Sequence, residues 1–418
     1  MSKQQEEDST DPESDLPIWA RKSAFPTADQ GYGWCNRKGV KHPCASLDEL
    51  SQEIREDKES AIHLVWTPDS EFCRVPEEVE AFTESISVVR KRWAVDDLAD
   101  ANHRLKWFGF CLLGLLCYMA FMGSRQMDAL ENSSGLVASP MEKIQWIFKI
   151  FTSSTTVGIS LLGFLVFAFI PWYQAQKRVR EMKRPAGLNA PLVPLLRFET
   201  WLQDQKSPVT WGILGMIVVV FLAQFFSGNA VEAAGLVKSE YLAGERWRLL
   251  TAPMMHGGIL HLAMNGMGLL YLGKRVEVFA RWPHVPMVFL FTALVGGEAS
   301  ARFVDANSVG ASGGLMGLLG FLLVFETLHS KLVPRSARRR LIGGVVMTGL
   351  IGLVGYRFID NAAHLGGLLA GMAYAVIVFP KSGSVLRPRV TLTDRLVGGA
   401  SLGVIAGSAI YAIIRMSA

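Results

Sequence analysis

The stretch VGASGGLMGLLG, residues 309–320, sets a serine among glycines at the head of an apolar run that continues to Phe325. The run is long enough to enter a bilayer, because roughly 20 apolar residues span the hydrocarbon layer. Each glycine costs a helix about 1 kcal/mol relative to alanine, so the five glycines here indicate a close approach of another backbone. Membrane helices use small residues routinely at their contacts, and residues elsewhere must decide whether Ser312 packs or reacts.

The composition of the chain is that of a polytopic membrane protein. Of the 418 residues, 50% are hydrophobic and 19% are charged, and the mean hydropathy is +0.26. The apolar residues gather into long runs after about residue 107, which is typical of a helical membrane bundle. The net charge of +5 is slight, and no basic tract interleaved with aromatic residues indicates a nucleic-acid partner.

The five cysteines carry no ligand pattern. Cys35, Cys44 and Cys73 precede the apolar runs, and the eight residues between Cys35 and Cys44 do not match zinc-knuckle spacing. We therefore expect ordinary reduced cysteines in a cytosolic fold, without a metal or other cofactor.

The beginning of the chain differs in character from the rest. Residues 1–16 carry six acidic side chains and almost nothing apolar, which predicts a disordered acidic tail. Residues 17–103 have the composition of a small soluble α+β domain, to which the sequence assigns no function. The acidic, polar start indicates neither a secretory signal peptide nor a mitochondrial presequence, so the expected location is a bacterial plasma (inner) membrane.

Local signals predict the elements of this soluble domain. Ser46 and Glu49 have the spacing of a capping box and predict a helix after them. Residues 61–66, rich in β-branched and aromatic side chains, predict a strand. Pro76 begins a helix that we expect to continue toward Trp93.

Nine apolar runs follow the soluble domain, and each predicts a membrane-spanning helix. They cover residues 107–123, 151–173, 208–226, 260–272, 286–302, 309–328, 341–354, 362–379 and 396–414.

The loops between these runs alternate in charge. Lys and Arg are concentrated in 176–206, 274–281, 331–340 and 381–395, whereas the intervening loops contain few of them. The positive-inside rule therefore places the basic loops and the N-terminal domain in the cytosol. Ser312 then lies at the non-cytosolic end of its helix, and four other polar side chains lie at the same depth: His256, His261, Asn265 and His364.

Two of the predicted helices carry matching glycine faces. His364, Gly367 and Gly371 are spaced i, i+3 and i+7 and share one helix face. Gly313 and Gly317 repeat the same small-xxx-small pattern beside the serine. Close packing of these faces would bring the hydroxyl and the imidazole within hydrogen-bond range.

Such a pair is what a serine nucleophile and its general base require. His261 and Asn265, at i and i+4 of another helix, would direct two hydrogen-bond donors to the place where an oxyanion forms. The alternative of metal binding by His256, His261 and His364 is weaker, because no carboxylate completes the set. A third interpretation keeps Ser312 and His364 as polar packing residues.

At this point the motifs resemble a known family. GASG at 310–313, HxxxxHxxxN at 256–265 and AHxxGxxxG at 363–371 together resemble the rhomboid intramembrane serine proteases. ERWR at 245–248 and YLGKRVE at 271–277 are similar to further stretches of that family. The resemblance covers about residues 205–380.

The resemblance implies a role for each matching position. Ser312 would be the nucleophile and His364 the general base, while the Ser312 N–H, His261 and Asn265 would form the oxyanion hole. Supporting roles are implied for His256 beside that hole, for Gly310 in shaping it, for Gly313, Gly367 and Gly371 in helix packing, and for Arg248 and Glu277 in bracing the outer loop and the helix ends.

The resemblance also implies the fold and the activity. We expect an all-α polytopic membrane protein with a six-helix core at 207–380. The apolar runs add two helices at 104–175 and one at 381–418, which depart from the family's six-helix pattern, and a basic connector covers 176–206. Its substrates would be transmembrane helices of other proteins, cut from the non-cytosolic side of the lipid bilayer. The oligomeric state stays open.

Two features bear on activity. Met316 stands where many bacterial members carry a tyrosine that stacks on the histidine, although methionine can also pack against an imidazole. The main alternative is an inactive rhomboid-like protein that binds transmembrane clients, and the retained Ser312 and His364 argue against it. A transporter is disfavoured, since the sequence contains neither an inverted repeat nor a charged residue near mid-membrane.

Overall fold

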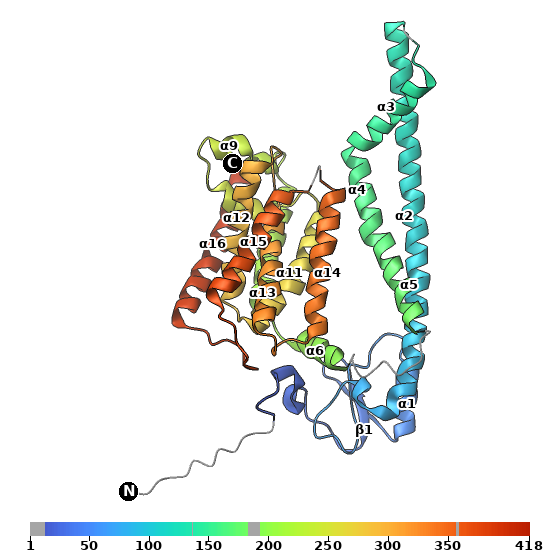
Figure 1. Ribbon diagram of the computed structural model, residues 1–418, viewed down its shortest axis with the longest axis vertical. Helices are drawn as coiled ribbons and strands as arrows, with labels where there is room; N and C mark the ends of the chain where they lie inside the picture. The colour runs from blue at the N-terminus through green and yellow to red at the C-terminus, as the bar shows by residue number, and fades with distance from the viewer. Residues whose placement is uncertain (1–12, 136, 183–192, 357–358) are drawn as a thin grey trace.

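The computed structural model describes residues 13–135, 137–182, 193–356 and 359–418, so most of the predicted acidic tail lies outside the described residues. Figure 1 shows a small N-terminal domain from which a long helical hairpin rises beside a helical core. The candidate site belongs to the core, and the hairpin and the N-terminal domain surround it.

The N-terminal domain contains a three-stranded antiparallel sheet in the order β2-β1-β3. The sheet is built from β1 (Tyr32–Cys35), β2 (Lys41–Cys44) and β3 (Leu64–Trp66). The strand predicted at 61–66 is β3, and it starts later than expected. The Asp57 carboxylate accepts hydrogen bonds from the backbone N–H groups of Ala61 and Ile62, which holds this segment in a turn.

Helix α1 (Leu47–Glu56) begins as the capping signal predicts. The Ser46 hydroxyl accepts the Glu49 N–H at 3.2 Å. The Glu49 carboxylate reaches one residue farther than a capping box requires and accepts the N–H of Ala45. Leu50 and Ile54 on the inner face of α1 pack with Val65 in the domain core.

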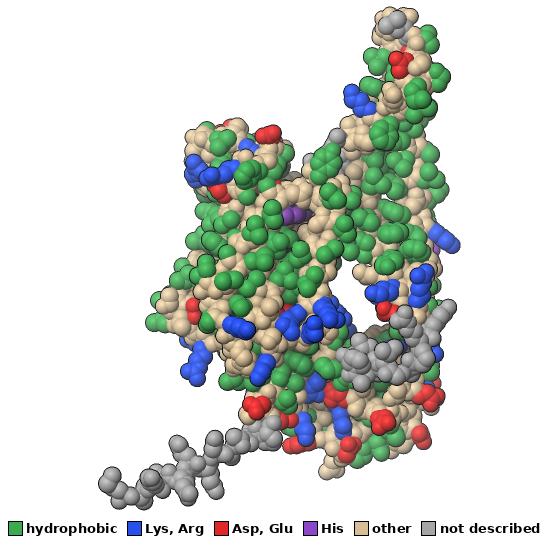
Figure 2. All heavy atoms as spheres, viewed as in Figure 1, with side chains coloured by type: hydrophobic (Ala, Val, Ile, Leu, Met, Phe, Trp, Pro, Cys, Tyr) green, Lys and Arg blue, Asp and Glu red, His purple; other side chains and the backbone are tan. Residues whose placement is uncertain are grey.

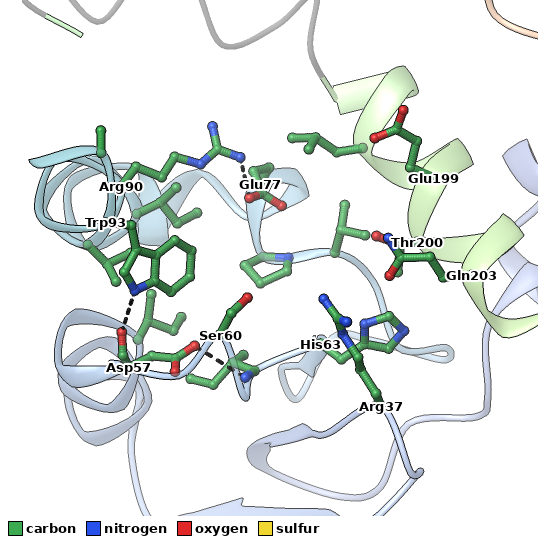
Figure 3. A pocket seen from close by; sticks show the side chains of 18 of the residues that line it. Arg37, Asp57, Ser60, His63, Glu77, Arg90, Trp93, Glu199, Thr200 and Gln203 are labelled. Carbon is green, nitrogen blue, oxygen red and sulfur yellow. Dashed lines mark hydrogen bonds and ion pairs between the residues drawn. The ribbon is translucent and has the colours of Figure 1, made fainter. Parts of the chain in front are cut away.

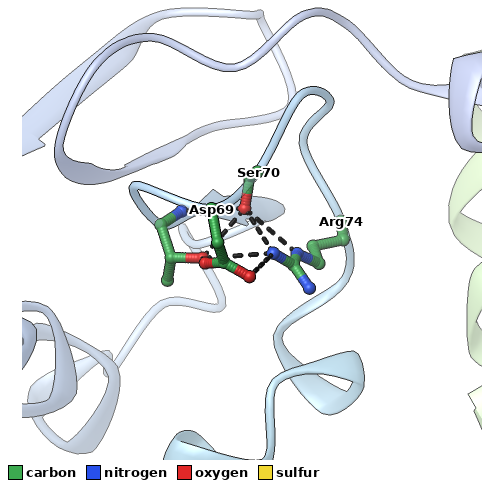
Figure 4. A network of polar contacts seen from close by, with 4 residues as sticks. Asp69, Ser70 and Arg74 are labelled. Carbon is green, nitrogen blue, oxygen red and sulfur yellow. Dashed lines mark hydrogen bonds and ion pairs between the residues drawn. The ribbon is translucent and has the colours of Figure 1, made fainter.

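A polar network closes the loop that follows β3 (Figure 4). The Arg74 guanidinium donates to Ser70 Oγ at 2.6 Å and to Asp69 at 2.9 Å. A hydrogen bond from the Thr67 hydroxyl, and then the Arg74 contact, hold the pKa of the Asp69 carboxyl below its ordinary value. In this loop the backbones of Arg74 and Val65 exchange two N–H···O hydrogen bonds, each of 2.9 Å.

The helix α2 (Thr83–Ser134) is one continuous element of 52 residues. Two short 3₁₀ turns, Pro76–Glu78 and Glu80–Phe82, precede it, so the helix predicted from Pro76 starts later and passes without a break into the first apolar run. At 1.5 Å per residue α2 is about 78 Å long. It ends at Gly135, whose φ of +71° is the left-handed cap that glycine adopts without strain.

The chain returns along α2 in three pieces. These are α3 (Pro140–Ser153), α4 (Thr155–Phe164) and α5 (Ile170–Met182), with a π-helical turn at Leu165–Phe169 between the last two. The second apolar run was predicted as a single helix from 151 to 173, and the break at Ser154 divides it. Trp172 Nε1 donates to Asn102 of α2 at 2.9 Å and ties the two arms together.

From residue 208 on, the core follows the predicted order of apolar runs, and one further helix, at 193–204, lies within the predicted basic connector. Its long helices are α6 (Val193–Asp204), α7 (Pro208–Gln224), α11 (Ile259–Phe279), α12 (His284–Phe303), α13 (Ser312–Leu328), α14 (Arg335–Val354), α15 (Asn361–Val378) and α16 (Leu392–Ser417). The loop between α7 and α11 holds three short helices, α8 (Ala230–Ala234), α9 (Lys238–Leu242) and α10 (Arg248–Thr251). Twelve of the 17 residues of α13 are buried, which makes it the central helix.

A buried ion pair links two of these helices. Arg275 of α11 and Glu326 of α13 lie 2.6 Å apart, with side chains only 2% and 1% exposed. Arg275 also lies over the ring of Phe198 on α6. This pair joins α11, α13 and α6 at the end of the core that faces the N-terminal domain.

Fewer of the described helices are long and apolar enough to span a membrane than the sequence predicts. Among the described residues, five helices are long and apolar enough to cross a bilayer, or six if the bent pair of α6 and α7 counts as one span. The helix α13 is apolar but shorter. The nine predicted spans exceed this number, so their count stays a prediction.

The side chains are distributed as an integral membrane protein requires. Figure 2 shows hydrophobic side chains over the flanks of the hairpin and the core, and Lys and Arg gathered where these meet the N-terminal domain. The basic side chains that the sequence groups into alternate loops therefore lie toward one end of the bundle.

Arg197 of α6 holds the N-terminal domain against the core. Its guanidinium binds the Glu78 carboxylate at 2.7 Å and donates to the carbonyl oxygens of Trp19 and Arg21. Trp19 Nε1 in turn donates to the carbonyl oxygen of Leu332, between α13 and α14, at 2.8 Å.

A cavity of about 450 Å³ lies between the N-terminal domain, the base of α2 and α6 (Figure 3). Its wall carries Arg90 paired with Glu77 at 2.5 Å and Arg178 paired with Asp97 at 3.0 Å. Each of these two arginines is paired with a carboxylate of the same wall, so neither presents an unpaired charge to the cavity.

Candidate active site

Gly310 shapes the backbone that leads into α13. Its φ of +126° is in the region that glycine adopts without strain, and its N–H donates to the carbonyl oxygen of Ala252 at 3.0 Å. A Cβ at this position would lie 2.6 Å from Cε1 of His261. Glycine is therefore needed here both for its conformation and for the space it leaves beside His261.

The glycine faces of α13 and α15 lie directly against each other. A Cβ built on Gly367 would collide with the carbonyl oxygen of Gly313, and one built on Gly371 would collide with that of Gly317. No larger residue fits at Gly367 or Gly371 without moving a backbone. The two helices thus approach as closely as the small-xxx-small pattern predicts.

This packing places Ser312 and His364 in the first turns of adjacent helices. Their chain neighbours meet, since a Cβ on Gly313 would lie 3.6 Å from the carbonyl oxygen of Ala363. Both side chains are half-buried. Among the described residues no hydrogen bond joins them, and Nδ1 of His364 is buried without a partner. Catalytic hydrogen bonds are often long before substrate binds, so this geometry is compatible with a nucleophile and its base.

His261 and Asn265 in the first turns of α11 complete the group. The His261 ring lies against Gly310, and its Nδ1 accepts the Gly257 N–H at 3.4 Å. The Asn265 amide is buried and donates to the His261 carbonyl oxygen at 3.1 Å. An amide has two N–H donors, so one is left for another acceptor.

The His256 ring packs against the His261 ring, with ring centroids 5.1 Å apart. Its backbone is held by Gln224 of α7, which exchanges two hydrogen bonds of 2.9 Å with it. Both of its ring nitrogens are buried without partners among the described residues. Within the part of the chain that the structure describes, no three His, Cys, Asp or Glu side chains are grouped as a metal ion requires.

The comparison with known protein families agrees with this arrangement. The sequence model of the family described as "Rhomboid domain" matches residues 243–381, which include every side chain of the group above. Residues 243–381 form a rhomboid domain. The match contains α10 to α15 and leaves the N-terminal domain, the hairpin, α6, α7 and α16 outside it.

Curated rhomboid proteins are similar to part of the chain. "Rhomboid protease GluP" of Bacillus subtilis is 32% identical over 193 residues, 44% of this chain and 37% of that protein. "RHOMBOID-like protein 6, mitochondrial" of Arabidopsis thaliana is 33% identical over 165 residues, 38% of this chain and 53% of that protein. "RHOMBOID-like protein 4" of Arabidopsis thaliana is 36% identical over 154 residues, which are 35% of this chain and 38% of that protein. The similarity thus spans about a third to a half of each relative's length.

Two of the predicted supporting residues, Arg248 and Glu277, join separate segments of the core by hydrogen bonds. The buried Arg248 guanidinium binds the carbonyl oxygens of Glu232 and Gly235, each at 2.9 Å, and fastens the loop between α7 and α11. The Glu277 carboxylate accepts the N–H groups of Val209 and Thr210 at 3.1 and 2.9 Å. It thereby caps the first turn of α7.

Sequence reasoning missed the polar side chains on the other side of Ser312. A small cavity of about 40 Å³ opens beside the serine, and its wall includes Ser300, Ser308 and Asp360. The Asp360 side chain is the N-cap of α15 and accepts the Ala363 N–H at 2.9 Å. An aspartate directly before an apolar helix is a capping signal that could have indicated this role.

Met316 lies one turn after Ser312 on α13 and is buried. This is the position noted above as a difference from many bacterial members of the family. Its polarizable side chain belongs to the apolar core around α13.

Proposed function

We propose that the chain is an intramembrane serine endopeptidase that hydrolyses peptide bonds in or near transmembrane helices of membrane proteins. The observation that carries this proposal is the contact between Gly313 and Ala363, the neighbours of Ser312 and His364 on two helices packed backbone to backbone. The name "Rhomboid protease" of the Bacillus subtilis relative supports the same activity.

In this mechanism Ser312 Oγ attacks the scissile carbonyl carbon while His364 takes its proton. The oxyanion that forms would accept hydrogen bonds from the Ser312 N–H, from His261 and from Asn265. Because Ser312 is the first residue of α13, the positive end of the helix dipole also favours negative charge there. His364 then returns the proton to the leaving amine, and water releases the acyl group by the same steps in reverse.

The proposal includes the orientation of the chain in the membrane. The N-terminal domain would lie in the cytosol and Ser312 on the opposite side of a bacterial plasma membrane. The Lys and Arg side chains gathered toward the N-terminal domain support this orientation (Figure 2). Residues 17–103, the hairpin and α16 would be additions to a six-helix protease core at 207–380.

The alternative is a rhomboid protein that binds transmembrane clients without cutting them. Covalent labelling separates the two, because a fluorophosphonate probe reacts only with an activated serine. We expect the purified full chain to be labelled, and Ser312→Ala and His364→Ala to lose the label while remaining folded. Ser401→Ala, which alters a serine of α16 that bonds to its own helix, is the matched control and should keep the label. A folded wild-type protein that resists labelling would instead support client binding.

A further inference from the structure

Four polar side chains from separate segments meet beside the candidate active site. Lys238 of α9 donates to Ser300 of α12 and, at 3.0 Å, to Ser308 in the loop that leads into α13. Both hydroxyls donate to Oδ2 of Asp360, that of Ser308 at 2.6 Å. Oδ1 accepts the Ala363 N–H. The Asp360 carboxylate thus receives three hydrogen bonds and ties α12, the loop and α15 together.

The Lys238 end of this network is buried, and Asp360 is half-buried. Lys238 is 7% exposed, and Ser300 is fully buried. Burial lowers the pKa of the Lys238 ammonium, and the charge of Asp360 opposes that change. Among the described residues no carboxylate touches Lys238 directly, so its charge reaches Asp360 through the two serine hydroxyls. A buried charge is costly unless it is paired and hydrogen-bonded, and these contacts supply both for Asp360.

Asp360 is close to His364 along the helix. It lies one turn earlier, and its carbonyl oxygen accepts the His364 N–H at 3.1 Å. Its carboxylate caps the first turn of α15, so its charge lies at the same end of that helix as the His364 ring and acts on it. Among the described residues the other titratable group that acts on this ring is His261 of α11, and Lys238 acts through Asp360.

We propose that Asp360 is a positioning residue for the reaction: its carboxylate fixes the first turn of α15, and its charge stabilises the imidazolium that forms when His364 takes the proton of Ser312. This inference rests on the proposed function. Since Nδ1 of His364 has no hydrogen-bond partner among the described residues, the stabilisation acts through space. In serine hydrolases whose catalytic triad includes an acidic residue, that residue stabilises the imidazolium through a direct hydrogen bond. The proton passes from Ser312 to His364 and then to the leaving amine, while Asp360 stays ionised.

The test compares the pH dependence of fluorophosphonate labelling in the full chain and in two variants. Asp360→Asn keeps the size and the capping oxygen but removes the charge. An opposite charge nearby shifts a titration by roughly 1–3 units, and Lys238 offsets part of this. We therefore expect the acid limb of the labelling rate to move about one unit toward lower pH, with a plateau roughly tenfold lower. Lys238→Met should move the limb toward higher pH, because it leaves the charge of Asp360 uncompensated.

Opposite shifts in the two variants would support the inference, since a purely structural role would lower the plateau without moving the limb. Acid limbs that coincide in wild type and in the folded variants would overturn it. If Asp360→Asn does not fold, the direction of the Lys238→Met shift decides. Failure of the proposed function would give a different result. Either the wild-type protein would not be labelled, or the Ser312→Ala variant would still be labelled.

Discussion

Gly367 lies directly against the carbonyl oxygen of Gly313, with no room for a side chain between them. Any residue other than glycine at position 367 would have to push α15 away from α13. Since Ser312 and His364 lie in the first turns of these two helices, their separation depends on a contact that involves neither side chain.

Gly367→Ala should therefore reduce both stability and labelling of Ser312. Overpacking of a tight contact costs about 1–3 kcal/mol, which thermal unfolding in detergent would detect. Gly349→Ala on α14 is the matched control, because a Cβ there meets nothing within 4 Å, and alanine favours a helix by about 1 kcal/mol over glycine. Equal behaviour of the two variants would contradict the proposed contact.

Gly310→Ala should abolish labelling of Ser312, an effect larger than the backbone strain at this position alone would cause. The new methyl group would carry the penalty of a positive φ, about 1–3 kcal/mol, and would also displace the His261 ring. Gly244→Ala separates the two effects. Gly244 also has a positive φ, +121°, but a Cβ there meets nothing within 4 Å. We expect Gly244→Ala to lose stability and keep its labelling rate. An active Gly310→Ala variant would remove His261 from the site.

Asn265→Ala should lower the turnover of a reconstituted transmembrane reporter by about 10²-fold, the usual effect of losing one oxyanion donor. The substrate concentration at half-maximal rate should change little, since the lost hydrogen bond forms in the transition state. Steady-state kinetics in liposomes would measure both. An unchanged rate would exclude Asn265 from the oxyanion hole.

Removal of one member of the Arg275–Glu326 pair should destabilise the core by about 3–5 kcal/mol, because the other charge is left buried and unpaired. Glu326→Leu and Arg275→Met each test this by thermal unfolding. The double variant should recover much of the loss, as apolar replacements of buried pairs often do. Additive losses in the double variant would argue against an energetic coupling between the two residues.

The sequence predicts the core better than its surroundings. The helices of the core follow from apolar runs, and the glycine spacing at Gly367 and Gly371 predicts how closely two of them pack. The full length of α2 could not be foreseen, because its polar first half and apolar second half look like separate elements. The strands Tyr32–Cys35 and Lys41–Cys44 are too short to give a periodic signal.

The Asp360 network was missed for a different reason. Lys238, Ser300, Ser308 and Asp360 come from four segments, and each is an unremarkable polar residue in its own stretch of sequence. Only the fold brings them together. The location of Ser312 and His364 in the first turns of two packed helices was foreseeable, because loop charges and glycine patterns assign both to the same end of their helices.

The packing around Phe279 bears on how this protein can be divided for expression. Phe279 stacks on Phe198 at 5.7 Å and also lies against Trp201, both on α6, although the family match begins only at residue 243. A gene fragment encoding the matched segment alone would expose this aromatic surface and would leave the Glu277 carboxylate without the α7 amides it caps. The smallest autonomous unit therefore begins no later than residue 193, the first residue of α6.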